Sequence, residues 1–200
     1  MQRILSSASR IFGRSGFRGA SMGQVARDAG VSKGLLHYHF RSKEHLLIEA
    51  QRATFKQIHT RFIERANRGE TGIDSGLAGI DALWTAIRDL AAWAPFMVRT
   101  MGVSCDQGPV RDAAQQFQSE AMTLLEQGIN HILAADAERL QIPPQRLAVL
   151  IRTTLRGLVV ELAHAASPEE LAEVDQAYAD FRHLMSQALF TRHGPSGARP

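Results

Sequence analysis

Residues 15–47, SGFRGASMGQVARDAGVSKGLLHYHFRSKEHLL, decide the fold of this 200-residue chain. Ser21 is a good N-cap residue for a short helix, and Gly30 can end that helix because glycine readily adopts the left-handed conformation. Ser32 is placed to cap a second, very short helix, and Ser42 to cap a longer one. The pattern therefore predicts two short helices around one tight turn, followed by a long helix.

The spacing of apolar residues predicts how these helices pack. Ala26 is small where two helices must approach each other, and Val31 can fill the core after the turn. Leu36 and Phe40 are expected to point inward. An earlier helix precedes the stretch, with one apolar stripe and an expected end near two glycines: Ile4, Leu5, Ala8, Ile11 and Phe12, then Gly13 and Gly16. Residues 1–46 therefore form a predicted three-helix head of the helix-turn-helix type.

The short helix after the turn leaves polar side chains on its outer side. Lys33, Gly34, His37 and Tyr38 are expected to face outward, where a lysine reaches phosphates or guanine edges and a glycine lets the backbone approach DNA. Each residue also has a structural interpretation. Tyr38 could be a half-buried core residue, Gly34 could mark a loop, and the histidines could be ordinary surface residues. Together they favour a helix that reads DNA.

Charge is distributed unevenly along the chain. Residues 1–46 carry eight Lys and Arg side chains against Asp28 and Glu44, a net charge of +6, whereas the remaining residues carry a net charge of −3. A basic end joined to a mildly acidic body is typical of proteins that bind polyanions. A merely solvated basic face would give the same count, so charge alone leaves both interpretations open.

The rest of the chain is also predicted to be helical. The helix that begins after Ser42 is expected to run to about Arg68, and residues 69–76, which hold three glycines, are expected to form a loop. Further helices are predicted, with breaks at prolines, at about 77–93, 95–104, 109–136, 144–166 and 168–190. The predicted fold is all-α, with a second domain over 47–190 and a disordered tail over 191–200.

The first quarter of the sequence resembles the TetR family of transcriptional regulators. The resemblance begins at Ile4-Leu5, continues through Gly16-Phe17, and is tightest over the stretch from Val25 to Phe40. It closes with Ser42-Lys43-Glu44-His45-Leu46-Leu47. The remainder matches the family only in its length and its helical pattern.

The resemblance implies a homodimer whose two heads bind successive major grooves of a palindromic operator in double-stranded DNA. It implies base contacts from the short helix and phosphate contacts from its end and from the next helix. Two positions depart from the family pattern, since Met22 follows Ser21 where a second hydroxyl residue is common, and Leu35 replaces a small or polar residue. A contact of the N-terminus with the minor groove is not expected, because the sequence shows no basic arm before the first helix. The predicted DNA-binding residues are Ser21, Ser32, Lys33, Gly34, His37, Tyr38, His39 and Lys43.

The resemblance also implies that the C-terminal helices hold a small-molecule pocket and the dimer interface. Large flexible apolar side chains suit a pocket for apolar or amphipathic molecules, although such residues are often plain core. The candidate ligand-binding residues are Trp84, Arg88, Trp93, Phe96, Met97, Met101, Phe117 and Met122. Arg99, Asp106, His131 and His164 are further polar candidates. The apolar stripes of helices 144–166 and 168–190 are wider than one contact requires, which favours dimerisation over purely intramolecular packing.

Several other classes of protein are disfavoured. The chain has no apolar run long enough for a membrane span and no signal peptide, so a cytoplasmic protein is expected. Its single cysteine, Cys105, could be a redox sensor or inert. His37 and His39 lack a third ligand at a recognised spacing, so no metal or cofactor is predicted. No catalytic motif is present, so an enzyme is not predicted.

The sequence thus predicts a ligand-responsive, DNA-binding transcriptional regulator, most simply a repressor that a small apolar or amphipathic molecule releases from its operator. The alternative is a DNA-binding dimer without a small-molecule ligand, controlled by a protein partner.

Overall fold

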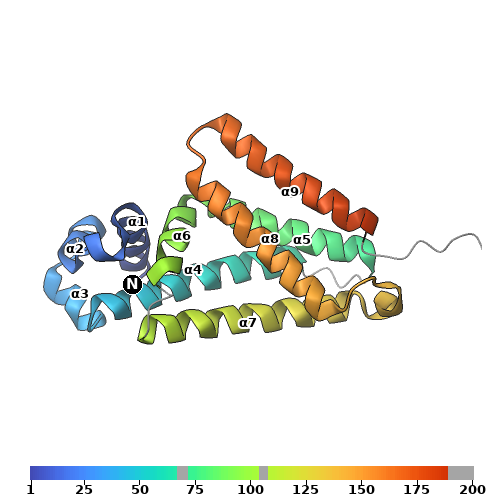
Figure 1. Ribbon diagram of the computed structural model, residues 1–200. Coiled ribbons are helices and arrows are strands. Elements are labelled where there is room, and N and C mark those ends of the chain that lie inside the picture. Colours follow the sequence, from blue (N-terminus) through green and yellow to red (C-terminus); the bar gives the residue numbers. More distant parts are fainter. Residues whose placement is uncertain (67–71, 104–107, 189–200) are drawn as a thin grey trace, which may run out of the picture.

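The computed structural model describes residues 1–66, 72–103 and 108–188 (Figure 1). Within these ranges the chain is helical and contains no β-strand, which confirms the predicted all-α class. The helices are α1 Gln2–Gly19, α2 Met22–Ala29, α3 Lys33–His39, α4 Lys43–Ala66, α5 Ile73–Arg88, α6 Ala94–Val103, α7 Pro109–Ile132, α8 Pro144–His164 and α9 Pro168–Ala188, with short 3-10 helices at Ala91–Trp93 and Ala134–Arg139.

The first three helices and the start of α4 form a head at one end of the molecule (Figure 1). Three residues of the stripe expected for the first helix are buried in its core, and the other two, Leu5 and Ile11, pack against that core while partly exposed. The buried core residues of the four helices are Ile4, Ala8, Phe12, Val25, Ala26, Ala29, Leu36, Phe40, Leu46, Leu47 and Ala50. Leu36 and Phe40 are buried as predicted. The apolar spacing in the sequence therefore located the core of the head correctly.

The two glycines expected to end the first helix have different roles. Gly16 breaks the helical conformation with φ 67°, a value that glycine adopts without strain, and one further helical turn follows it to Gly19. Gly13 does not end the helix. It lies where α1 touches α6, and a Cβ atom at this position would come within 3.1 Å of the backbone nitrogen of Phe96. The prediction was wrong for Gly13, because this glycine is required by a close contact with a helix that is distant in the sequence and does not mark a helix end.

The long helix α4 joins the head to the rest of the molecule without interruption (Figure 1). Its predicted end near Arg68, like the predicted tail over 191–200 and Cys105, lies outside the described residues. Packing also crosses the predicted boundary at residue 46, since Phe96 and Val110 belong to the core of the head and the rings of Phe12 and Phe96 stack with centroids 6.4 Å apart.

The remaining helices enclose a second core, built mainly by α5, α7, α8 and α9. The prediction of a loop over 69–76 was wrong for residues 73–76, which form the first turn of α5. Gly76 packs there against the end of α7, because a Cβ atom would meet Leu133 Cδ2 at 3.4 Å. The glycines permit close helix packing rather than a loop. The predicted helices 77–93 and 109–136 also end earlier, at Arg88 and Ile132, and are followed by 3-10 helices.

Prolines begin three of the helices, as predicted. Pro109, Pro144 and Pro168 each occupy the first turn of α7, α8 and α9, where the missing N–H would have no partner within the helix. Among the described residues, no helix is both long and apolar enough to cross a membrane.

Candidate DNA-binding interface

Helix α2 begins with a capping box. The Ser21 hydroxyl accepts a hydrogen bond from the backbone N–H of Gln24 at 3.2 Å, and the Gln24 side-chain oxygen accepts one from the backbone N–H of Ser21 at 2.8 Å. These reciprocal bonds satisfy N–H groups that the first turn of a helix leaves without partners. Ser21 thus has the capping role predicted for it, and it remains exposed on the surface of the head.

The turn between α2 and α3 depends on Gly30. This residue has φ 64° and ψ 39°, the left-handed conformation expected at the end of a helix. The backbone N–H of Val31 donates to the carbonyl of Ala26 at 3.0 Å, and the guanidinium of Arg3 donates to the carbonyl of Ala29 at 2.7 Å. Arg3 therefore holds the turn from α1. Sequence reasoning missed this role because the two residues are 26 positions apart.

Helix α3 presents one buried side and one free side. The Ser32 hydroxyl caps it by accepting from the backbone N–H of Leu35 at 3.1 Å. Lys33, Gly34 and His37 are exposed, and Tyr38 is 83% exposed. None of the Lys33, His37 and Tyr38 side chains makes a hydrogen bond or an ion pair within the described part of the chain, so this side of α3 is open to a binding partner.

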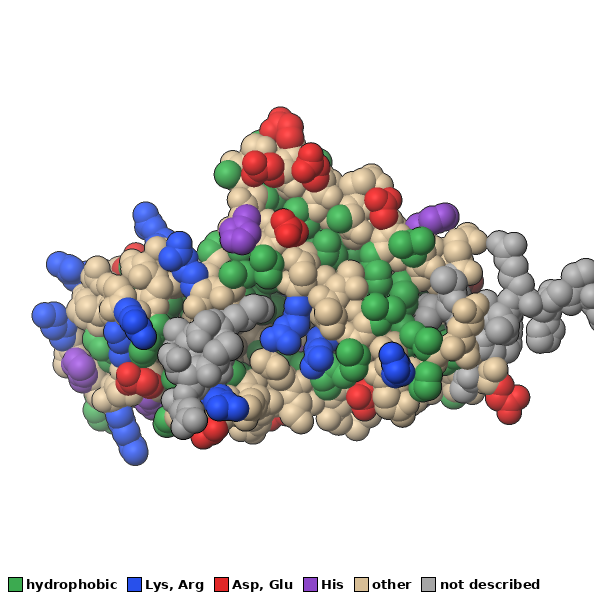
Figure 2. Space-filling view, in the orientation of Figure 1, with side chains coloured by type: hydrophobic (Ala, Val, Ile, Leu, Met, Phe, Trp, Pro, Cys, Tyr) green, Lys and Arg blue, Asp and Glu red, His purple; other side chains and the backbone are tan. Residues whose placement is uncertain are grey.

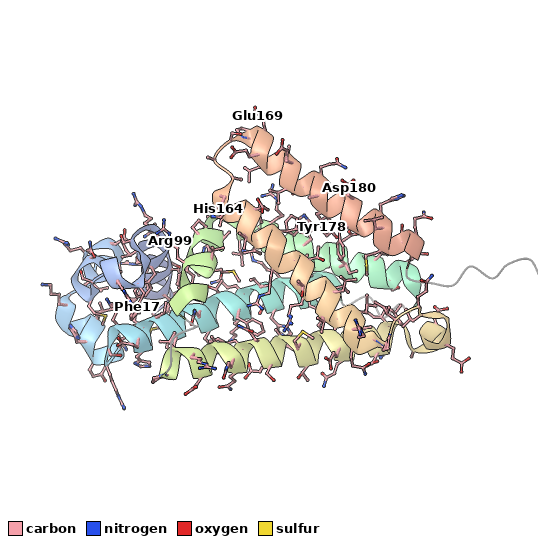
Figure 3. All side chains as sticks on the ribbon, in the orientation of Figure 1. Phe17, Arg99, His164, Glu169, Tyr178 and Asp180 are labelled. Atoms are coloured by element: carbon pink, nitrogen blue, oxygen red, sulfur yellow. The ribbon has the colours of Figure 1, made fainter. Side chains whose placement is uncertain are left out.

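The two other predicted phosphate-binding residues are held by neighbours. His39 is half-buried, with its ring edge-on to the rings of Tyr38 and Phe40 at 5.2 and 6.3 Å. The ammonium of Lys43 donates to the carbonyl of Ala20 at 3.1 Å and lies 4.5 Å from the ring centroid of Phe17. Figure 3 shows Phe17 in the head, next to the start of α4. The Lys43 side chain therefore fastens α4 to the junction between α1 and α2.

The start of α4 has its own polar arrangement. The Ser42 hydroxyl accepts a hydrogen bond from the backbone N–H of His45 at 3.1 Å. The Glu44 carboxylate accepts a hydrogen bond from its own backbone N–H and interacts with Ser42, and both effects lower the pKa of Glu44. A negative charge therefore already occupies part of this helix N-terminus, which is the position expected to attract a phosphate.

Basic side chains cover the exposed surface of the head (Figure 2). They come from α1, α2, α3 and the segment before α4, and all are exposed: Arg10, Arg14, Arg18, Arg27, Lys33 and Arg41. Asp28 forms an ion pair with Arg10, and the hydrogen bond from that guanidinium, with one from Ser7, lowers the pKa of Asp28. The positive charge predicted from composition therefore lies on the surface of the head that contains α3, where it attracts a polyanion such as DNA.

Residues 4–50 match the family model described as bacterial regulatory proteins of the tetR family. The matched segment covers the capping box, the Gly30 turn, α3 and the first turns of α4. This segment is a DNA-binding head of the TetR family.

Curated relatives extend the TetR-family similarity beyond the head. The chain is 27% identical over 130 residues to the HTH-type transcriptional regulator LmrA of Bacillus subtilis, covering 63% of this chain and 69% of LmrA. It is 24% identical over 180 residues to the HTH-type transcriptional repressor AcnR of Corynebacterium efficiens, covering 86% of this chain and 87% of AcnR. The similarity to named transcriptional regulators thus extends well beyond the head of this chain.

Solved structures share the whole TetR-family fold. A proposed transcriptional regulator from Saccharomonospora viridis, in complex with choline, superposes with a TM-score of 0.78 at 18% identity, over 96% of this chain and 97% of that protein. The regulator FadR of Bacillus subtilis, in complex with stearoyl-CoA, superposes with a TM-score of 0.73 at 14% identity, over 94% and 98% of the two chains. At these identities the likeness concerns the fold alone.

The predicted ligand-binding residues are spread over several environments in this chain. Trp84 is buried and stacks on Tyr178 of α9 at 4.9 Å, on the side of α9 that faces α5 (Figure 3). Arg88 forms a two-point ion pair with Asp175, at 2.7 and 2.8 Å. These two residues fasten α9 to α5.

The other candidates do not converge either. Phe96 and Trp93 pack with the core of the head, Met97 contacts both cores, and Met122 packs against the second core. Phe117 lines an open hollow between α4 and α7, where it stacks on Phe55. The side chain of Met101, and Asp106, lie outside the described residues, whereas Arg99, His131 and His164 are exposed.

A wholly apolar cavity lies elsewhere, between α4, α5, α7 and α8. Its volume is about 60 Å³. No predicted ligand-binding residue lines it, and its described lining holds no polar side chain: Phe62, Gly76, Leu77, Gly79, Ile80, Leu83, Leu124, Leu125, Gly128, Ile129, Ile132, Leu133, Leu147 and Ile151. Composition could not locate this cavity, because its lining comes from four helices that are far apart in the sequence.

Proposed function

We propose that this protein is a transcriptional repressor that binds a palindromic operator as a homodimer and leaves it when a small molecule binds. The observation that carries the proposal is the open side of α3, where exposed Lys33, Gly34, His37 and Tyr38 lie within a basic surface. The fold fills the opposite side of this helix with core residues. A short helix with one buried side and one free polar side suits insertion into the major groove.

The roles of individual residues follow from their placement. Lys33 and His37 are free to reach base edges, and Gly34 lets the backbone of α3 approach the DNA. Tyr38 extends toward the phosphates, with His39 beside it. Ser21 and Ser32 cap their helices and present polar groups at helix starts. We assign Lys43 to the same phosphate region, but through the backbone at the start of α4, because its ammonium is already bonded to Ala20.

Homodimerisation is supported by exposed apolar residues on the last two helices. Val149 and Leu150 of α8 are 45% and 44% exposed, and Leu184 of α9 is 64% exposed. Their burial against a second copy would remove apolar surface from water and place two heads on one DNA duplex. Palindromic operators suit such a symmetric pair, because each head would meet the same half-site one helical turn apart.

Release by a small molecule is supported by contacts between the head and the body, which consists of the later part of α4 and helices α5 to α9. Helix α4 runs through both, and α6 contacts α1 through Phe12, Gly13 and Phe96. A molecule that binds one arrangement of the body more tightly would therefore shift the spacing of the two heads. The name of AcnR as a repressor, and the structures of relatives bound to choline and to stearoyl-CoA, fit this proposal.

The test begins with selection of bound fragments from random double-stranded DNA, using the full chain. We expect one palindromic sequence whose half-sites lie one helical turn apart, and an affinity that falls steeply with salt. Light scattering of the complex should give two chains per duplex. Selection of a single unpaired half-site, or binding without any sequence preference, would contradict the proposal. Release of this DNA by a purified protein, with no small molecule found, would support the alternative of a protein partner.

A further inference from the structure

Two arginines one helical turn apart on α8, Arg152 and Arg156, have no anionic partner among the residues that the structure describes. Both side chains are half-buried. The Nε atom of Arg152 is closed off from solvent and has no hydrogen-bond acceptor. Among the described residues, the side-chain oxygen of Gln51 is the only other buried side-chain nitrogen or oxygen atom without a hydrogen-bond partner. A buried donor without an acceptor costs free energy, and a charged donor costs more than a neutral one. The pair is therefore a local defect in the isolated chain.

The two guanidinium groups also act on each other. Burial and the positive charge of Arg152 lower the pKa of Arg156. No described carboxylate forms an ion pair with either arginine. Two other half-buried arginines have carboxylate partners, since Arg88 meets Asp175 and Arg182 meets Asp81 through two bonds each. Arg152 and Arg156 have no such partner among the described residues.

The pair is partly open to solvent and lies next to an apolar part of α8. On the same helix, Leu147 and Ile151 line the apolar cavity, and Ile151 is adjacent to Arg152 in the sequence. A positively charged flank and an apolar flank therefore meet on one turn of α8.

We propose that Arg152 and Arg156 bind the carboxylate of a small-molecule effector that has an apolar body. A carboxylate accepts two parallel hydrogen bonds from one guanidinium, and its charge would neutralise the repulsion within the pair. The proposal rests on the proposed function for its regulatory meaning, but binding of a carboxylate to the protein can be measured without DNA.

The test uses isothermal titration of the full chain with octanoate and with octanamide, which has the same length and no charge. We expect octanoate to bind about tenfold or more tightly than octanamide, the difference typical of a hydrogen bond to a charged group. Inorganic phosphate should bind more weakly than octanoate. The variant Arg152→Gln/Arg156→Gln should lose the preference for octanoate. The control Arg146→Gln changes an exposed arginine of the same helix and should bind as the unmodified chain does.

A second measurement needs no ligand. The double variant should melt a few degrees higher than the unmodified chain, because an unpaired buried charge has been removed; about 1 kcal/mol corresponds to roughly 2–4 °C in a chain of this size. The control Arg146→Gln should leave the melting temperature unchanged. A double variant that folds and melts higher but keeps the preference for octanoate would overturn the site.

Other outcomes would also overturn the proposal. These are no octanoate binding by the unmodified chain, phosphate binding as tight as octanoate binding, or dissociation of a dimer in the double variant, which would place the pair in a subunit interface. If octanoate binds through the two arginines but does not release operator DNA, the carboxylate site stands and release by this ligand fails. If the chain binds no operator at all, the proposed function fails and the titration result remains valid.

Discussion

The ammonium of Lys43 donates a hydrogen bond to the carbonyl oxygen of Ala20, 23 residues away, at 3.1 Å. The same ammonium lies over the ring of Phe17. We expect Lys43→Met to lower the free energy of unfolding by about 1–2 kcal/mol, because a charged donor and its contact with an aromatic ring are both lost. Urea unfolding measures the change. DNA affinity should fall as well, since α4 would no longer be fixed against the head.

The matched control for this change is Lys33→Met. Lys33 is exposed and makes no ion pair or hydrogen bond in the described structure, so its removal should leave stability within about 0.5 kcal/mol. DNA affinity should still fall, and the loss should vary with the base sequence. Equal stability of the two variants would show that the contact between Lys43 and Ala20 contributes nothing to the folded state.

Replacement of Tyr38 should weaken DNA binding without lowering the stability of the fold, unlike replacement of Lys43. With 83% of its surface exposed and a ring contact only to His39, Tyr38→Ala should leave the melting temperature almost unchanged. Binding to every DNA sequence should weaken by about tenfold, the value of one hydrogen bond to a charged phosphate, and the dependence of affinity on salt should change little. Fluorescence anisotropy with operator and with unrelated DNA measures both.

Tyr38→Phe separates the hydroxyl from the ring. If the hydroxyl holds a phosphate, this variant should lose nearly as much affinity as Tyr38→Ala. Unchanged affinity in both variants would mean that α3 does not face the DNA in the way proposed.

Replacement by alanine should change stability in opposite directions at Gly30, in the turn, and at Gly34, in α3. Gly30 has φ 64°, and a Cβ atom would lie 3.1 Å from the guanidinium of Arg3, so Gly30→Ala should destabilise the chain by about 1–2 kcal/mol. Gly34 lies within α3 with no close neighbour, so Gly34→Ala should stabilise the helix by about 0.5–1 kcal/mol. Chemical denaturation of both variants tests this contrast.

DNA binding should separate these two variants again. Gly34→Ala adds a methyl group to the open side of α3, so affinity for the operator should fall although the protein is more stable. A variant that is both more stable and equally tight in DNA binding would exclude a close approach of the α3 backbone to the DNA.

The features that the sequence predicted well are those determined within a few residues. Ser21, Gly30 and Ser32 act within one helical turn, so their roles as caps and turn residues follow from local geometry. The burial of Leu36 and Phe40 follows from periodicity alone. The exposed residues of α3 were found for the same reason, since a side chain that is not on the buried face of a short helix must face outward.

The features that the sequence could not predict depend on partners far along the chain. Arg3 reaches Ala29, and the ammonium of Lys43 reaches Ala20, through a fold that no local pattern encodes. Trp84 and Arg88 have the residue types of a ligand pocket, but their partners on α9 give them structural contacts. The Nε atom of Arg152 lacks an acceptor, and this can be seen only from the three-dimensional surroundings of the side chain.

Asp28 gives a prediction about pH. Its hydrogen bond with Arg10 holds its pKa below the ordinary value of 3.8. A carboxylate with a lower pKa in the folded state stabilises the fold above the unfolded pKa and loses that contribution as pH falls through the folded pKa. The unmodified chain should therefore be more stable than Asp28→Asn near pH 6, and the difference should shrink below about pH 4. Thermal unfolding across this range tests the sign, and a difference that grows toward low pH would contradict it.

The contact between Gly13 and Phe96 predicts how the head communicates with the body. A Cβ atom at residue 13 would lie 3.1 Å from the backbone nitrogen and 3.3 Å from the Cα atom of Phe96, so α1 and α6 must move apart in Gly13→Ala. We expect a loss of about 1–3 kcal/mol in stability, as for other overpacked positions. Operator affinity should also change, because the head is displaced relative to α6. The control Gly19→Ala adds a methyl group near the end of α1, where its nearest neighbour is the Ser15 side chain at 3.6 Å, and should leave operator affinity nearly unchanged. If Gly13→Ala loses stability but binds the operator as the unmodified chain does, the contact between α1 and α6 supports the fold without setting the position of the head.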